Sequence, residues 1–468
     1  MWKKLLITGC VTFSLLSGGT LSAQPSCEIK EEVTSEQLDR TQKELVAMMK
    51  ELKNDSYFQT ELDKAAVQSS LSKRMAAYKD LTVRLLSVLE IQAELEWMKP
   101  EAIQEALGIM KKSSGFDAVL ADKRFGELKS LLAGGFDGIY TGDAQAIDKA
   151  NKTLTLKRKL MLMSPDVNVD KMLTVKFDLG ERANFVGAGS LGIQPNNWSN
   201  LSSASRKNFK AQLVELSGLQ SGELSEKVLY KPAVDGSSVT DLVLNWDGKR
   251  LMFTALDTTR RWQVHELDIN NGEAKQVTNI PEPDLEFFDG TYLPDGRMLA
   301  ISNIGYQGVP CVNGSDAVGN MVLYDPSNGY LRRLTFDQDA NWHPVVMANG
   351  KVMYVRWEYT DLTHYFSRIV MHMNPDGTEQ KSLYGSGSMF PNSIFDVQPL
   401  PKHTNRFVGV ISGHHGVARS GRLMIFDPAK SRKEEKGMIQ ELPFRGRPII
   451  PEVKDELVNG VWPQFIKP

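Results

Sequence analysis

The spacing of apolar residues along this chain changes once, near Met172. Before that point apolar residues recur every three or four positions, which is the period of one face of an α-helix. After it they alternate with polar residues, which is the period of a β-strand. The change predicts a helical N-terminal region at 28–165 and an all-β region at 171–468.

Several helices are expected in the N-terminal region. Thr34-Ser-Glu-Gln37 fits a capping box, in which the Thr and Gln side chains satisfy free amides at a helix start. Pro100 suits the first position of another helix. The Met and Leu stripes of these segments are interpreted as core rather than as a binding groove. The expected segments are about 34–52, 72–98, 100 onward, 116–132 and 143–160.

A short turn phrase recurs between apolar runs of the all-β region. It reads Trp246-Asp-Gly-Lys249, Pro294-Asp-Gly-Arg297 and Ala348-Asn-Gly-Lys351. Asp-Gly and Asn-Gly in this setting are strong hairpin signals, because the turn needs residues with positive φ. The long interval between the turns, from 247 to 295 and from 295 to 349, favours propeller blades over a sandwich.

Each repeat is predicted to be one four-stranded blade of a WD40-like β-propeller. The residues after Trp462 resemble the start of a further strand, and an unclosed ring would leave open sheet edges. The propeller is therefore expected to be C-terminally incomplete. About five blades are expected in this sequence, near 171–231, 240–280, 289–336, 343–384 and 393–444.

The first residues have the pattern of a secretory signal peptide, predicted at 1–23. Lys3-Lys4 is followed by a mostly apolar stretch, and Ala23 is a small residue near the expected cleavage position. The apolar stretch is too short to span a bilayer. A periplasmic or extracellular location is predicted, with no transmembrane helix in the mature chain.

Charge and cysteine content narrow the function classes. The 55 Lys and Arg residues nearly balance the 57 Asp and Glu residues, and no basic run occurs, so nucleic acid is not an expected partner. No Cys-x-x-Cys-His sequence is present, so no c-type haem is predicted. The sequence leaves open whether the protein binds a divalent metal ion. Cys27 and Cys311 remain after cleavage, as unpaired thiols or as a disulfide, with unpaired thiols favoured.

The candidate functional residues are concentrated in the long loops between second and third strands. These loops lie on the face of a blade opposite its tight turns. Function concentrates in loops on a rigid scaffold, so this loop-rich face is the expected site. His364, His414 and His415 are candidate metal ligands. Successive histidines in an extended segment point in opposite directions, which favours ordinary loop residues. The candidate ligand-binding residues are Arg356, Glu358, Asp361 and Arg419, although Arg356 and Glu358 would also suit a mutual ion pair.

Several motifs occur in order along the all-β region, among them Asn196-Asn-Trp-Ser199, Gly308-Val-Pro-Cys-Val312, Leu334-Thr-Phe-Asp-Gln-Asp339, Arg356-Trp-Glu-Tyr-Thr-Asp361 and Ser412-Gly-His-His-Gly-Val417. Together they resemble the proteins related to the alpha subunit of hydrazine synthase. The resemblance covers about residues 150–468, and it implies an exported protein with a six-bladed, TolB-like propeller and a chain that continues past Pro468. Those alpha subunits carry c-type haems, and this sequence has no attachment motif, so their haem chemistry does not carry over.

Two function classes remain open from the sequence. The favoured one is a secreted scaffold that binds a protein or small-molecule ligand on the loop-rich face. The alternative is a periplasmic metal-dependent enzyme that uses histidines and carboxylates on the same face. Convergence of His364, His414 or His415 with Asp or Glu in one cleft would separate the two.

Overall fold

The computed structural model describes residues 33–178 except 168, residues 195–442 except 208, 222, 359–366, 389 and 414–417, and residues 465–467. The predicted signal peptide at 1–23 and Cys27 lie outside these residues, and the side chain of Cys311 is not described. The chain divides into two compact units. Among the described residues, one unit contains those up to Met172 together with 215–227, and the other contains those of 173–214 and those from Val228 onward.

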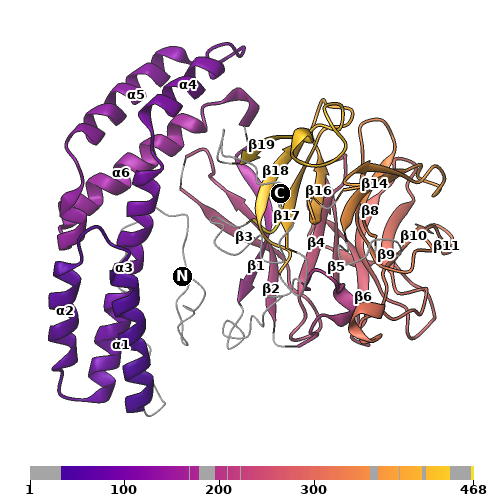
Figure 1. The fold of residues 1–468 in the computed structure, drawn as a ribbon, viewed down its shortest axis with the longest axis horizontal. Coiled ribbons are helices and arrows are strands. Elements are labelled where there is room, and N and C mark those ends of the chain that lie inside the picture. The colour runs from indigo at the N-terminus through magenta and orange to yellow at the C-terminus, as the bar shows by residue number, and fades with distance from the viewer. Residues whose placement is uncertain are drawn as a thin grey trace. The chain divides into compact units, whose positions relative to one another are not determined.

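The first unit is mainly helical (Figure 1). The capping box at Thr34 is confirmed, since its side chain accepts a hydrogen bond from the Gln37 amide and the Gln37 side chain accepts one from the Thr34 amide. Pro100 occupies the first turn of its helix, as predicted. The α-helices are α1 Ser35–Met49, α2 Ser56–Ala66, α3 Leu71–Glu96, α4 Pro100–Met110, α5 Ala118–Ala133 and α6 Ala144–Met161.

Apolar stripes hold these helices together. α1 and α2 pack on α3, and α5 packs on α6. Helix α2 was not predicted, although its buried residues Phe58, Leu62 and Ala65 follow helical spacing. Among the described helices, none combines the length and the apolar content that crossing a bilayer requires. Short 3-10 helices are η1 Asp137–Thr141, η2 Pro165–Val167, η4 Leu201–Ser203, η5 Pro310–Val312 and η6 Glu435–Gly437.

The second unit is built from antiparallel strands. Four consecutive meanders of four strands each follow the predicted order of strand, tight turn, strand, loop, strand, turn, strand. Their strands are β4 Val239–Leu244, β5 Arg250–Leu256, β6 Trp262–Asp268 and β7 Ala274–Gln276; β8 Phe287–Tyr292, β9 Met298–Ser302, β10 Asn320–Asp325 and β11 Tyr330–Arg333; β12 Asn341–Val346, β13 Val352–Trp357, β14 Arg368–Met373 and β15 Lys381–Tyr384; β16 Ser393–Pro399, β17 Phe407–Ser412, β18 Arg422–Phe426 and β19 Met438–Leu442.

The three Asp-Gly-type turns close hairpins, as predicted. Gly248, Gly296 and Gly350 have φ values of 68°, 89° and 79°, which the backbone of these turns requires. Each turn joins the first two strands of its meander. The first strands of successive meanders also pack against one another, β4 on β8, β8 on β12 and β12 on β16. This is the arrangement expected of neighbouring blades.

Two parts of the β region differ in detail from a simple row of blades. Strands β1 Lys171–Asp178, β2 Lys210–Ser217 and β3 Ser225–Tyr230 form a three-stranded sheet within the segment predicted as the first blade. A single parallel pairing of Arg368 with Ser393 links the last two meanders into one eight-stranded sheet. No closed sheet occurs among the strands described.

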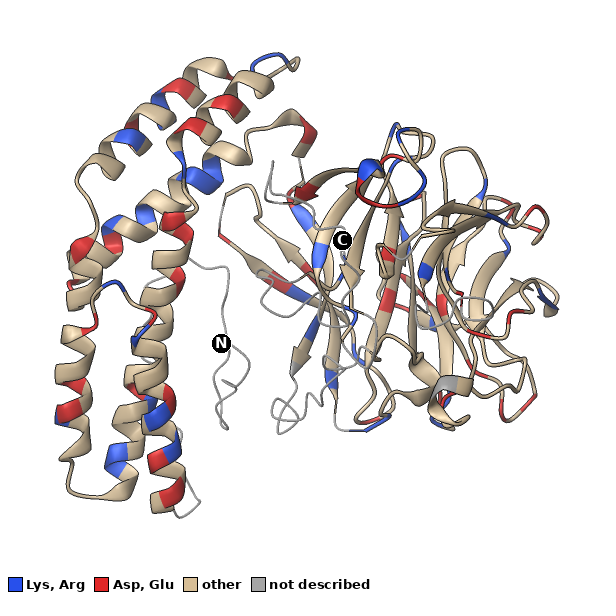
Figure 2. Ribbon diagram, in the orientation of Figure 1, with Lys and Arg blue, Asp and Glu red and all other residues tan. Residues whose placement is uncertain are grey.

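Large side chains fill the space between neighbouring meanders. Trp342, Trp357 and Phe395 are buried together, with the two indoles stacked 6.1 Å apart between centroids. Charged residues of both signs are interspersed along the helices and strands (Figure 2). The buried aromatic core fixes how adjacent first strands meet, and those strands carry the polar cluster described next.

Candidate functional site

The first strand of each meander contains a β-bulge at an equivalent place. Its bulge residue has φ between 50° and 55°, a left-handed conformation that Asp tolerates better than most residues. Each bulge residue lies six positions before the residue that opens the turn (241 and 247, 289 and 295, 343 and 349, 396 and 402). We call these residues the bulge cluster: Asp241 in β4, Asp289 in β8, His343 in β12 and Asp396 in β16.

Hydrogen bonds join the bulge cluster from one meander to the next. The backbone amide of Asp289 donates to Asp241 Oδ2 at 3.1 Å, and the amide of His343 donates to Asp289 Oδ2. The His343 Nδ1 atom lies 3.3 Å from Asp289 Oδ2 and 3.3 Å from Asp396 Oδ1. The side chains of the bulge cluster therefore find their hydrogen-bond and ion-pair partners on other first strands. In this way the cluster connects four consecutive first strands.

Two further cations come from distant parts of the chain. Lys467 Nζ lies 3.1 Å from Asp241 Oδ1 and 4.0 Å from Asp396 Oδ1, and two backbone hydrogen bonds between Phe465 and Gly421 anchor its segment. The Arg419 side chain is held differently. Its guanidinium lies over the Trp342 and Phe395 rings, 4.7 and 4.8 Å from their centroids, and donates to the carbonyl oxygens of Asn196 and Ser199.

Opposite charges set the ionisation of the bulge cluster. Burial opposes protonation of His343, yet Asp396 and Asp289 raise its pKa above the ordinary value. Burial likewise works against the charged form of Asp289, but the neighbouring His343 holds the pKa of this carboxyl low. Burial lowers the pKa of Arg419 to about 10, so this residue stays charged at neutral pH. Three carboxylates thus face three cations.

The space beside the cluster is small. A cavity of about 20 Å³ lies against Asp241, Asp289, His343, Arg419 and Lys467, which is room for about one water molecule. Such a void does not accommodate an organic substrate without rearrangement.

A loop segment from Asn196 to Asn200 lies against this cavity and is bonded to several meanders. The side-chain amide of Asn197 donates to the Gly413 carbonyl at 2.6 Å, and that of Asn200 donates to the Ala317 carbonyl at 2.6 Å. Arg368 Nε donates to the Asn197 carbonyl at 3.0 Å. The segment from Asn196 to Asn200 is thus hydrogen-bonded to three meanders, and we call it the Asn196–Asn200 strap.

A larger opening lies between the first two four-stranded meanders, and we call it the hairpin groove. Its volume is about 350 Å³, and residues of the β4–β5 and β8–β9 turns form its rim. Trp246 stands at this rim with 63% of its surface exposed. Apolar side chains form part of the lining, namely those of Met252, Val277, Leu293 and Met298.

The ionised residues that line the hairpin groove are three cations and one carboxylate. Glu266 is that carboxylate, and it contacts Arg250 Nη1 at 3.5 Å and Lys275 Nζ at 3.3 Å. Arg297 is the third cation and pairs with Asp295 at 2.6 Å. The Arg250 guanidinium also lies 5.8 Å from the centroid of the Tyr292 ring. Arg250 also pairs with Asp247 at 2.8 Å, so each of the three cations has a carboxylate partner. The groove combines an exposed indole, an apolar lining and balanced ion pairs.

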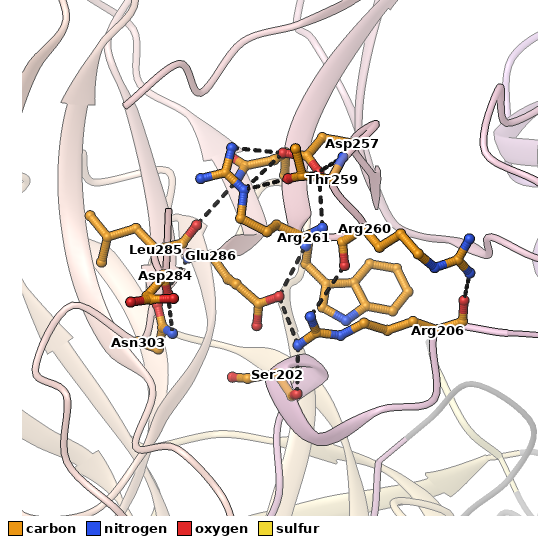
Figure 3. Close-up of polar contacts among 12 residues, drawn as sticks. Ser202, Arg206, Asp257, Thr259, Arg260, Arg261, Asp284, Leu285, Glu286 and Asn303 are labelled. Atoms are coloured by element: carbon orange, nitrogen blue, oxygen red, sulfur yellow. Dashed lines mark hydrogen bonds and ion pairs between the residues drawn. The ribbon is translucent and has the colours of Figure 1, made fainter. Parts of the chain in front are cut away.

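A separate polar network surrounds Glu286 (Figure 3). The Glu286 carboxylate accepts hydrogen bonds from the Trp262 amide at 3.2 Å and from Arg206 at 2.8 Å. Burial raises the pKa of Glu286 to about 7, and Arg206 only partly offsets this. Arg206 also donates to the Ser202 and Arg260 carbonyls. These contacts join three loops. We therefore interpret the network as one that stabilises the fold.

Two predicted ligand-binding residues form an ion pair. Arg356 Nη2 lies 3.1 Å from Glu358 Oε2 and 3.0 Å from Asp337 Oδ1, so the predicted pairing of Arg356 with Glu358 is confirmed. Asp339 is buried nearby, and burial raises its pKa to about 6. Arg419, the third described candidate, is 4% exposed and belongs to the packed surroundings of the bulge cluster. A ligand-binding role for these residues stays a prediction.

The other predicted site residues cannot be placed. Asp361, His364, His414 and His415 lie outside the described residues, so their proposed convergence is untested. Within the described ranges, no three His, Cys, Asp or Glu side chains are arranged to hold a metal ion.

Both the bulge cluster and the hairpin groove were missed from the sequence. The cluster does have a signal, which is an Asp or His six residues before each turn residue. The groove has none, because its rim brings together turns that are 48 positions apart, at 247 and 295.

No family model and no curated relative matches this sequence. Among solved structures, hydrazine synthase from Kuenenia stuttgartiensis aligns at 14% identity and a TM-score of 0.43, over 55% of this chain and 37% of its own. TolB from Acinetobacter baumannii aligns at 18% identity and a TM-score of 0.33, over 47% of this chain and 46% of its own.

A putative TolB from Agrobacterium tumefaciens aligns at 19% identity and a TM-score of 0.29, over 39% of this chain and 61% of its own. This chain therefore spans less than two thirds of each of these proteins. The likenesses are too remote to carry an argument about function, which has to rest on the residues of this chain.

Proposed function

We propose that this protein is an exported, haem-free scaffold whose meanders are blades of a TolB-like β-propeller and which binds a ligand rather than transforming one. The hairpin groove carries this proposal. Its volume of about 350 Å³ falls in the range of ligand sites, whereas the cavity at the bulge cluster has room for about one water.

The lining of the groove favours a peptide ligand. Exposed Trp246 offers the kind of rigid aromatic surface that dominates protein interfaces, and Met252 and Met298 are adaptable apolar contacts. The cations Arg250, Lys275 and Arg297 are each paired with a carboxylate, namely Asp247, Glu266 or Asp295, so these charges balance. The complementary occupant is therefore a peptide segment of a protein partner that carries an exposed apolar or aromatic residue.

A synthetic peptide array tests this function. Random heptapeptides are screened with the purified protein, and enrichment of apolar and aromatic residues is expected. Trp246→Ala should weaken binding of the selected peptides by about tenfold or more, because removing an aromatic anchor costs about 2 kcal/mol. Phe336→Ala is the matched control, since Phe336 is a 72% exposed aromatic residue that is not part of the groove.

Two results would overturn the proposal. One is an array without any enrichment over a scrambled background. The other is binding that Trp246→Ala and Phe336→Ala weaken equally, because that would place the peptide somewhere other than the hairpin groove.

The alternative function, a periplasmic metal-dependent enzyme, rests on His364, His414 and His415. Elemental analysis of the purified protein tests it directly. A transition metal bound in equal proportion to protein, and lost in the His414→Ala/His415→Ala variant, would favour the enzyme over the scaffold.

A further inference from the structure

We propose that the bulge cluster is a binding seat for a primary ammonium group, which Lys467 occupies in this structure. The proposal does not depend on the hairpin groove. The ligands that suit such a seat are primary amines, such as a lysine side chain or the free amino terminus of a peptide.

The geometry supplies the acceptors that an ammonium group needs. Lys467 Nζ donates to Asp241 Oδ1 at 3.1 Å and lies 4.0 Å from Asp396 Oδ1. One acceptor of the cluster, Asp396 Oδ2, is buried and has no hydrogen-bond partner. The ring of bulge residues therefore retains hydrogen-bonding capacity that the rest of the fold does not use.

The charge balance makes the seat specific for a cation. Asp241, Asp289 and Asp396 are opposed by His343 and Arg419 when Lys467 is left out, which leaves an excess of one negative charge. Arg419 does not fill the seat, since the backbone oxygens of Asn196 and Ser199 and two aromatic rings hold its guanidinium. A buried carboxylate without a partner is costly, so an empty seat should attract a cation.

The seat is accessible to small molecules. The side chain of Lys467 is 39% exposed, so its path to the carboxylates is open to solvent. Its removal would add the volume of that side chain to a cavity of about 20 Å³. Ethylammonium is a suitable probe because it carries the same –NH₃⁺ donors on a short apolar stem.

Chemical rescue of Lys467→Ala tests the proposal. The variant should unfold at a temperature about 3–6 °C below the unaltered protein. Ethylammonium chloride, at concentrations on the order of 10–100 mM, should restore the midpoint in a saturable manner. Tetramethylammonium chloride, a cation without N–H donors, should not restore it. Lys249→Ala is the control, because Lys249 is exposed on the β4–β5 turn.

A second variant separates the seat from a general loss of stability. Lys467→Ala/Asp241→Asn removes one carboxylate together with the cation, so it should be more stable than Lys467→Ala alone and should no longer respond to ethylammonium. A double variant less stable than the single one, or rescue by both ammonium salts alike, would overturn the proposal.

The unaltered protein offers an independent measurement that no folding defect can obscure. Competitive acetylation with acetic anhydride at neutral pH, read by mass spectrometry, should modify Lys467 at least about tenfold more slowly than Lys249. Equal reactivity of the two lysines would show that the ammonium of Lys467 is not held by the carboxylates, and the proposal would fail.

Discussion

At the scale of single residues, burial decides what a charged side chain does. Arg419 was selected from the sequence as a ligand contact because it follows a histidine-rich loop motif. In the structure its guanidinium lies over the Trp342 and Phe395 rings and donates to backbone oxygens of the Asn196–Asn200 strap. An arginine in this setting stabilises the fold through stacking and through hydrogen bonds in fixed directions.

Arg419→Ala should therefore lower the free energy of unfolding by about 3–5 kcal/mol, since it leaves the buried carbonyl oxygens of Asn196 and Ser199 without their charged donor. Arg419→Lys should recover little of this loss, because an ammonium lacks the planar stacking surface of a guanidinium. Urea unfolding monitored by circular dichroism measures both. Arg332→Ala, on the exposed face of β11, is the control and should change stability by less than about 0.5 kcal/mol. A well-folded Arg419→Ala protein of unchanged stability would contradict the structural role.

Glu286 gives a residue-scale prediction about pH. Burial raises its folded-state pKa from 4.5 to about 7, so the folded protein binds this proton more tightly than the unfolded chain does. The contribution of the protonated carboxyl to stability is complete below about pH 4.5 and is lost as the pH rises toward 7. Glu286→Gln does not titrate and should not show this loss.

The comparison is made by urea unfolding from pH 4.5 to pH 8. The stability of Glu286→Gln relative to the unaltered protein should rise across the window from pH 4.5 to 7, by at most about 1.4 kcal/mol per pH unit. Glu273→Gln, at an exposed position in the β6–β7 turn, serves as the control. Parallel curves for Glu286→Gln and the unaltered protein would mean that Arg206 keeps the carboxylate charged throughout.

At the scale of elements, the bulges show how one residue can serve both backbone and side-chain requirements. Asp289 has a φ of 54°, and its carboxylate accepts a hydrogen bond from the amide of His343 in the next meander. An Asn at this position tolerates the positive φ and keeps an acceptor oxygen. A Gly tolerates the positive φ but has no side-chain acceptor, and an Ala neither tolerates the φ nor supplies an acceptor.

The expected order of stability is therefore Asp289, then Asp289→Asn, then Asp289→Gly, then Asp289→Ala. The last two should differ by about 1 kcal/mol, which is the cost of a left-handed φ without a compensating side chain. Chemical unfolding of the three variants gives the order. If Asp289→Ala were as stable as Asp289→Gly, the backbone conformation at the bulge would not be a constraint.

Elements with local signals were the ones predictable from the sequence. The capping box of α1, Pro100 in α4 and the positive-φ glycines of the hairpins each depend on a few adjacent residues. The contacts of the bulge cluster do not. Lys467 and Asp241 are 226 positions apart, and the pairing of Phe465 with Gly421 holds the Lys467 segment beside the cluster. Asp241 alone is indistinguishable from any polar residue of an edge strand.

At the scale of the whole molecule, the cysteine content bears on whether this chain can carry a c-type haem. Covalent attachment of a c-type haem requires two cysteine thiols and an adjacent histidine ligand in one short segment. The sequence contains three cysteines, and no Cys-x-x-Cys-His segment among its 468 residues. We therefore expect no covalent c-type haem on this chain.

Expression with an export signal and a cytochrome c maturation system provides the test. The purified protein should show no Soret band that survives denaturation, and a haem stain of a denaturing gel should be negative at about 52 kDa. A c-type cytochrome produced in the same cells is the positive control, because it shows that the maturation system was active. A covalent haem signal at the mass of this chain would require an attachment chemistry other than the paired-thiol motif, and it would return redox catalysis to the functions open to this protein.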